Sequence, residues 1–180
     1  MKTLFAFCIS ALFAIQVANA EELVIGEEII EPGIQLIFEG AVKDTVMPAG
    51  YNLPEDQTHV HIEARVNWAE DDIPEGTPAG GFVGYLVMTA QVINAETGAI
   101  ATVDLVPHIN LIDNLHYARN MALPGKITDK YNVIFNVMPP GEYTLSYHKD
   151  WIDQYGNKLF DKQSFMYKEV DFEAIARASR

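Results

Sequence analysis

The sequence predicts an all-β fold of the sandwich type, and three observations support this. Apolar residues fall in short runs that are rich in β-branched and aromatic side chains. Segments rich in Gly, Pro, Asn and Asp separate these runs, as they do between the strands of a sandwich. Only residues 172–180 suggest a helix, of one or two turns. Strands are expected at residues 34–38, 59–68, 82–94, 99–107, 131–137, 142–148 and 164–172.

The first three expected strands lie on either side of one long loop. Residues 34–38 read IQLIF, and residues 59–68, HVHIEARVNW, alternate apolar with polar side chains as a strand with one buried face does. Residues 82–94 form a longer run that ends at the turn sequence NAETG. Residues 69–81, AEDDIPEGTPAGG, are acidic and rich in Pro and Gly, so we expect a surface loop there rather than a linker between domains.

Turn sequences also delimit the later strands. Residues 99–107 follow NAETG, and LPGK precedes residues 131–137. The sequence MPPGE leads into residues 142–148, and DQYGN precedes residues 164–172.

Residues 1–20 have the pattern of a secretory signal peptide. Lys2 precedes an apolar run, and small residues at positions 18 and 20 predict cleavage before Glu21. A membrane anchor is the alternative, but the run is shorter than the ~20 apolar residues that span a bilayer. The only cysteine, Cys8, lies within this segment, so the mature chain has no disulfide. Export without cysteines favours the bacterial periplasm, with no membrane insertion.

Charge and missing motifs narrow the class of function. The formal net charge of −13 disfavours nucleic acid and anionic lipid as partners and attracts cations, although acidity can also serve solubility alone. No Gly-x-Ser-x-Gly segment and no phosphate-binding glycine loop occurs. We therefore expect a protein that is not an enzyme.

The segment His59 to Glu63 predicts metal ligands. Alternation places His59, His61 and Glu63 on the face of the strand opposite the core. Side chains two residues apart on one face are close enough for imidazoles and a carboxylate to bind one ion. The alternative is a solvated polar face that happens to contain histidines.

The other three histidines, His108, His116 and His148, each end an apolar or aromatic run near a turn. Taken singly, each could be a half-buried core histidine. Strand ends at one edge of a sandwich can meet, however, and would then form a histidine-rich pocket. Imidazole suits copper, zinc and iron, and the carboxylate of Glu63 adds affinity for ferrous iron.

Five segments in order resemble a known family. They are the IGE of residues 25–27, the His-x-His-x-Glu-Ala strand of residues 59–65, the YL…INxxTG hairpin of residues 85–98, the Val-Pro-His and His-Tyr elements of residues 106–118, and the Tyr…Pro-Pro strand of residues 131–140. The chain resembles the periplasmic iron-transport proteins that bind copper and accompany a high-affinity iron permease of the inner membrane. The resemblance spans about residues 25–148.

The resemblance implies a ligand set. It comprises His61, His116 and, in place of the family's methionine, His108, with Glu63 close by and His148 as the best match to a later histidine. His59 replaces an aspartate of the family pattern, and the segment from residue 108 to 116 is one residue longer. An all-imidazole site should hold Cu(II), Zn(II) or Fe(II) well and favour Cu(I) less.

The expected protein has a signal peptide, residues 1–20, and one immunoglobulin-like β-sandwich, residues 21–180. The resemblance implies a homodimer with the metal near the subunit interface, and a role in iron uptake with copper, iron or zinc as the bound ion. Two alternatives stay open: a copper-dependent redox protein that presents iron to the permease, and an adaptor or chaperone that binds no metal.

Overall fold

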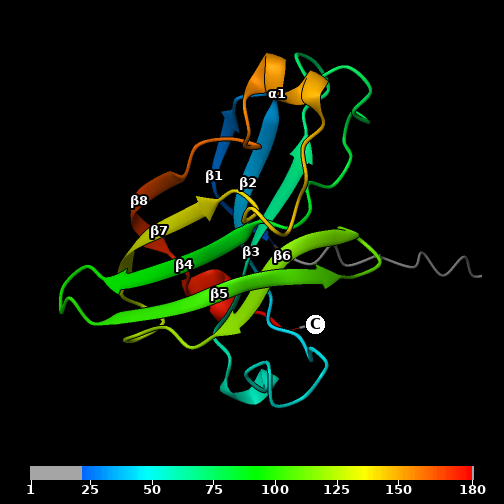
Figure 1. Cartoon of the computed structure of the whole chain (residues 1–180). Helices are drawn as coiled ribbons and strands as arrows, with labels where there is room; N and C mark the ends of the chain where they lie inside the picture. Colours follow the sequence, from blue (N-terminus) through cyan, green and yellow to red (C-terminus); the bar gives the residue numbers. More distant parts are fainter. Residues whose placement is uncertain (1–21, 180) are drawn as a thin grey trace, which may run out of the picture.

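The computed structural model describes residues 22–179, which form eight antiparallel strands and three short helices (Figure 1). The strands are β1 Glu22–Ile30, β2 Ile34–Ala41, β3 Val60–Trp68, β4 Val87–Asn94, β5 Ile100–Ile109, β6 Leu115–Met121, β7 Lys130–Met138 and β8 Gln163–Asp171. The helices are the 3-10 turn η1 Glu55–Gln57 and the α-helices α1 Lys149–Tyr155 and α2 Glu173–Arg177.

The strands form one sheet in the order β1-β2-β3-β6-β5-β4-β7-β8. Strand β5 joins the two halves of this sheet, because residues 100–105 pair with β4 and residues 106–109 pair with β6. The halves face each other, so that Phe38 of β2 stacks on Phe135 of β7 with ring centroids 4.2 Å apart. The predicted all-β sandwich is confirmed, with its two layers drawn from one continuous sheet.

The two edge strands also approach each other. Tyr167 of β8 donates a hydrogen bond to Glu28 of β1 at 3.0 Å. Its ring lies over Gly26, where an added Cβ would come within 2.2 Å of the ring. Only glycine fits there without moving Tyr167, which is the structural reason for the glycine of the IGE segment.

Strand β3 has the alternation that its sequence predicts. Val60, Ile62, Ala64 and Val66 are fully buried in the core between the two layers. Burying an aliphatic side chain of this kind contributes roughly 1.5–3 kcal/mol. A slip of one residue would move all four out of the core, so this face fixes the register of β3.

The strand predicted at residues 142–148 is wrong. A turn forms there, in which the Thr144 N–H donates to the Gly141 carbonyl at 2.8 Å, and the residues after it run without strand pairing. Tyr147 packs against the core and stacks on Trp151 of α1, with ring centroids 6.1 Å apart. The apolar character of this segment therefore serves packing. The other six predicted strands are present, with shifted ends.

Four elements were not predicted: β1, β6, α1 and the short turn η1. Strand β1 lies at the sheet edge and mixes acidic with apolar residues. Strand β6, LHYARNM, contains no β-branched residue, and α1 is a seven-residue helix that buries no residue. Strand β6 and helix α1 lack the composition on which strand and helix prediction depends, whereas β1 contains Val and Ile but is interrupted by a glycine and three glutamates.

The predicted loop at residues 69–81 contains neither helix nor strand, and α2 is the predicted C-terminal helix. The signal peptide predicted at residues 1–20 lies outside the described residues. Within residues 22–179, no helix has the length and apolar character needed to cross a membrane.

Candidate metal centre

Three neighbouring strands bring four of the predicted ligands to one face of the sheet. Strand β6 lies between β3 and β5, with His61 opposite Asn120 and His108 opposite His116. Paired residues, and residues two apart along a strand, point to the same side of a sheet. The side chains of His61, Glu63, His108 and His116 therefore project together.

The turn between β5 and β6 keeps two of these histidines aligned. The Asn110 side-chain oxygen accepts backbone N–H bonds from two of the next residues, at 2.8 and 2.6 Å. Asn114 follows with φ 61°, a conformation that Asn tolerates better than most residues. His108 and His116 remain in direct register. Any extra residue between them is therefore taken up by the turn.

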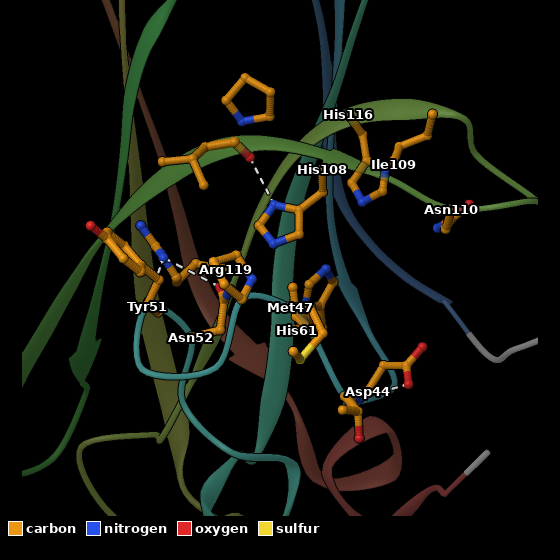
Figure 2. Close-up of a pocket in the computed structure, with 15 residues that line it drawn as sticks. Asp44, Met47, Tyr51, Asn52, His61, His108, Ile109, Asn110, His116 and Arg119 are labelled. Atoms are coloured by element: carbon orange, nitrogen blue, oxygen red, sulfur yellow. Dashed lines mark hydrogen bonds between the residues drawn. The ribbon is translucent and has the colours of Figure 1, made fainter.

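The three histidines line one cavity of about 560 Å³. Figure 2 shows His108 and His116 at the β5–β6 hairpin, with His61 on the adjoining strand. The Nε2 atoms of His61 and His116 lie 3.8 and 3.7 Å from the same oxygen, Oε2 of Glu63. These distances exceed a hydrogen bond and match the roughly 3–4 Å between two ligands of one ion with bonds near 2.0–2.2 Å. The His108 ring centroid is 5.4 Å from that of His61.

Each of the three imidazoles is held in the tautomer that binds metal through Nε2. Nδ1 of His108 lies 2.8 Å from the Val106 carbonyl, and Nδ1 of His116 lies 3.0 Å from the Asn114 carbonyl. A carbonyl only accepts, so Nδ1 carries a proton, and in the neutral imidazole the lone pair is then on Nε2. Burial also lowers the pKa of His108, which favours the neutral form. Such Nδ1–H bonds are typical of metal-binding histidines.

Asn120 fixes the third imidazole. Its amide nitrogen donates to the Asp44 and Leu53 carbonyls at 2.8 and 2.9 Å, so its oxygen must face His61. That oxygen lies 2.7 Å from Nδ1 of His61, which therefore donates. In the neutral imidazole, the lone pair of His61 is then on Nε2, on the side of Glu63.

The carboxyl group of Glu63 lacks the surroundings that a buried charge needs. Glu63 is 1% exposed, and its Oε1 has no hydrogen-bond partner among the described residues. Burial, followed by repulsion from Glu39, Asp113 and Glu22, raises the pKa of Glu63 to about 8. A cation at this position would satisfy the carboxylate. Together with the three imidazoles, the carboxylate forms a donor set that fits copper or zinc.

The ligand face of β3 is covered, so it is not the solvated polar face that was the alternative interpretation of the sequence. His61 and Glu63 are as buried as the core residues of the same strand, at 6% and 1% exposed. Residues 42–59 pass over this face, held by the two bonds from Asn120. Both faces of β3 are therefore covered.

Two of the predicted ligands do not join the cavity in this chain. His59 accepts the Leu123 backbone N–H at Nδ1, at 3.0 Å, the reverse of the pattern in the other histidines. His148 precedes α1 and lines a separate pocket with Trp68 and Trp151. The pocket was expected to contain five histidines, and in one chain it contains three. His148 is absent because residues 142–148 do not form the predicted strand.

A family model described as Fe2+ transport protein matches residues 19–174. The chain belongs to this family. The family resemblance that the five sequence segments indicated is thereby confirmed, and it extends beyond residue 148.

Two solved structures have a fold similar to that of this chain. A copper-bound variant of FetP from uropathogenic Escherichia coli strain F11 has a TM-score of 0.68 at 22% identity, covering 84% of this chain and 99% of that chain. A copper-bound variant of Campylobacter jejuni P19 also has a TM-score of 0.68, at 23% identity, covering 83% and 96%. These likenesses show a shared fold.

A relative in sequence is a UPF0423 protein of Brucella abortus (strain 2308). It is 28% identical over 123 residues, which are 68% of this chain. The match spans 65% of the length of that relative.

Several residues at the candidate metal site were not identified from the sequence. Ligand atoms of Glu22, Glu63 and Asp113 lie within 4.8 Å of one another, forming a carboxylate group beside the imidazoles. Met47 lines the histidine cavity, and Asn120 orients His61. Glu22 and Asn120 lie on the two strands that were not predicted, and Met47 lies in a loop without a periodic pattern. Asp113 belongs to a segment that the resemblance had marked, but no role was given to it.

Proposed function

We propose that this chain is a copper-binding protein of the bacterial periplasm that acts in iron uptake with an inner-membrane permease. The observation that carries the proposal is the convergence of three imidazoles, each fixed by an Nδ1–H bond, beside a buried carboxylate. The copper-bound FetP and P19 structures support copper as the ion. FetP was also obtained by expression in the periplasm, which supports the proposed location.

We assign copper to His61, His108 and His116, with Glu63 beside them. Among divalent first-row metals, affinity at nitrogen sites is highest for Cu(II). Bound copper would supply a cation able to change between Cu(II) and Cu(I). The imidazoles provide neutral donors that need no reorientation, and the carboxylate provides the compensating negative charge.

Fe2+ is the cargo in this proposal, and the carboxylates of Glu22, Glu63 and Asp113 are its binding group. Carboxylate oxygens suit hard divalent ions better than soft donors do. One oxygen of Glu63 faces His61 and His116, and the other is buried with no hydrogen-bond partner within residues 22–179. Glu63 can therefore serve both groups, and the formal charge of −13 favours capture of the cation.

We still propose His148 as a ligand, but for the metal site of a second subunit in a dimer. In Figure 1, α1, which His148 precedes, and the loop of residues 43–58 lie at opposite ends of the sandwich. A side chain that does not reach the site of its own chain can reach that of a second copy in a symmetric dimer. The homodimer implied by the family resemblance would place it there.

Copper titration of matched variants tests the assignment. Wild type should bind one Cu(II) per chain, His116→Ala should lose this stoichiometric binding, and His59→Ala should keep it. Because His116 is buried, circular dichroism must show that the variant retains its β-sheet, and His116→Gln provides a second variant of similar size. Stoichiometric binding in both folded His116 variants would refute the copper assignment.

A mixing experiment tests the contribution of His148 from a second subunit. His148→Ala and the double variant His61→Ala, His116→Ala should each bind copper poorly alone. Mixed dimers should regain one complete site of the two, since each subunit supplies what the other lacks. If mixing restores no binding although mixed dimers form, His148 does not act in trans.

A further inference from the structure

A thioether lies at the mouth of the histidine cavity. Met47 lines the same cavity as His61, His108 and His116, and Figure 2 shows its side chain in the part of the cavity where His61 lies. Met47 is 72% exposed and does not belong to the apolar core. Its side chain thus contributes little packing where it stands.

The loop that carries Met47 is fastened on both sides of this residue. Asn120 donates to the Asp44 carbonyl before it, and Arg119 donates to the Tyr51 carbonyl after it, at 2.8 and 2.7 Å. Both anchors belong to β6, the strand of His116. The backbone is therefore fixed relative to the imidazoles, whereas the unbranched methionine side chain retains its rotational freedom.

The chemistry of this side chain differs from that of the other donors. The histidine and carboxylate groups offer only nitrogen and oxygen, which suit Cu(II), Zn(II) and Fe(II), whereas a thioether is a soft donor that selects Cu(I). We propose that Met47 is an additional ligand that this chain uses for Cu(I) and not for Zn(II). The inference rests on the proposed copper site and assigns it a residue from a different element of the fold.

Methyl-labelled methionine makes the contact directly visible. In full-length mature protein with [methyl-13C]methionine, Cu(I) added without oxygen should shift the Met47 methyl resonance. Met166 of β8 is also exposed but lies outside the cavity, so its resonance should remain in place. Zn(II) should leave both unchanged. A Met47 resonance that does not respond to bound Cu(I), or that responds equally to Zn(II), would overturn the proposal.

Affinity measurements provide the second readout. Met47→Leu should weaken Cu(I) binding by about tenfold to a hundredfold, the range typical of residues that tune a metal site, and leave Zn(II) affinity unchanged. Met166→Leu is the matched control and should change neither. A Met47→Leu variant with wild-type Cu(I) affinity would refute the role of Met47 while leaving the histidine site standing. If the wild-type protein bound neither Cu(I) nor Zn(II), this result would instead refute the proposed function.

Discussion

Asn120 is one buried side chain with three hydrogen-bond partners: His61 and the carbonyls of Asp44 and Leu53. It sets the tautomer of a proposed ligand and holds the loop above it. Asn120→Asp would remove the amide donor and place a negative charge against two carbonyls. We expect copper affinity to fall by about tenfold to a hundredfold, with a loss of about 1–3 kcal/mol in the free energy of unfolding.

Competition with a chelator and urea unfolding measure these two effects, and 15N spectra of the His61 imidazole report its tautomer. Asn136→Asp is the matched control, since Asn136 of β7 donates only a long bond to Thr89, outside the cavity. Equal effects of the two substitutions would contradict the positioning role of Asn120.

Tyr117 holds β6 to the segment before β4. Its hydroxyl donates to the Val83 carbonyl at 2.9 Å and accepts the Leu86 N–H at 3.1 Å. Tyr117→Phe leaves both backbone groups unpaired and should cost about 1–3 kcal/mol of unfolding free energy at neutral pH. Urea unfolding measures this loss, and Tyr143→Phe, at a fully exposed position, should show none.

The effect of Tyr117→Phe should also depend on pH. Burial raises the pKa of Tyr117 to about 12, above the unfolded value near 10. Its stabilisation is therefore complete below pH 10 and is lost as the pH rises through 12. The stability difference between wild type and variant should narrow over that interval. A constant difference would mean that the hydroxyl titrates alike in both states.

At the level of single residues, the sequence identified the ligand types but not their orientation. Alternation along β3 placed His61 and Glu63 on one face, and the structure keeps them there. The same pattern included His59, which instead accepts the Leu123 N–H. Which nitrogen of a histidine carries the proton depends on carbonyls brought by the fold, such as those of Val106 and Asn114, and no local pattern encodes them.

Among the elements, the loop of residues 43–53 depends on Arg119 for its second attachment. Arg119 donates to the Tyr51 carbonyl at 2.7 Å and to the Asn52 side chain at 3.3 Å. Arg119→Met keeps the aliphatic stem and removes these donors. Amide hydrogens of residues 43–53 should then exchange faster, and bound copper should be lost to a chelator more quickly, because the loop opens more often.

Hydrogen exchange followed by mass spectrometry checks this expectation segment by segment. Arg177→Met removes an exposed pair with Glu173 on α2 and should leave the loop unchanged. Protection of residues 43–53 in Arg119→Met equal to that of wild type would show that Arg119 is not needed to hold the loop.

Strands rich in β-branched and aromatic residues could be predicted from the sequence. Segments whose structure depends on the strands that flank them in the sheet could not. Residues 131–137 carry β-branched and aromatic side chains and form β7. Strand β6 lacks β-branched residues and exists because β3 and β5 flank it. Residues 142–148 have strand-like composition but pack through Tyr147 instead. Pairing partners distant in the sequence decided these cases.

For the whole molecule, a ligand bound only by the folded chain adds to its stability. With free copper at a thousandfold over its dissociation constant, the free energy of unfolding should rise by about 4 kcal/mol. A chelator should reverse the gain, and His116→Ala should show none. Denaturant unfolding with and without copper measures this. An equal gain in His116→Ala would indicate copper bound elsewhere on the acidic surface.

The path of β5 between the two halves of the sheet has a consequence for kinetics. Its last residues carry His108 and pair with β6, so the site is complete only when the β5–β6 hairpin is in register with β3, which is distant from it in the sequence. Closing such long loops precedes any gain from the metal. Interactions absent from the folding transition state leave the folding rate unchanged and slow unfolding. Bound copper should therefore lengthen the lifetime of the folded chain, and its release should be tied to the opening of these three strands.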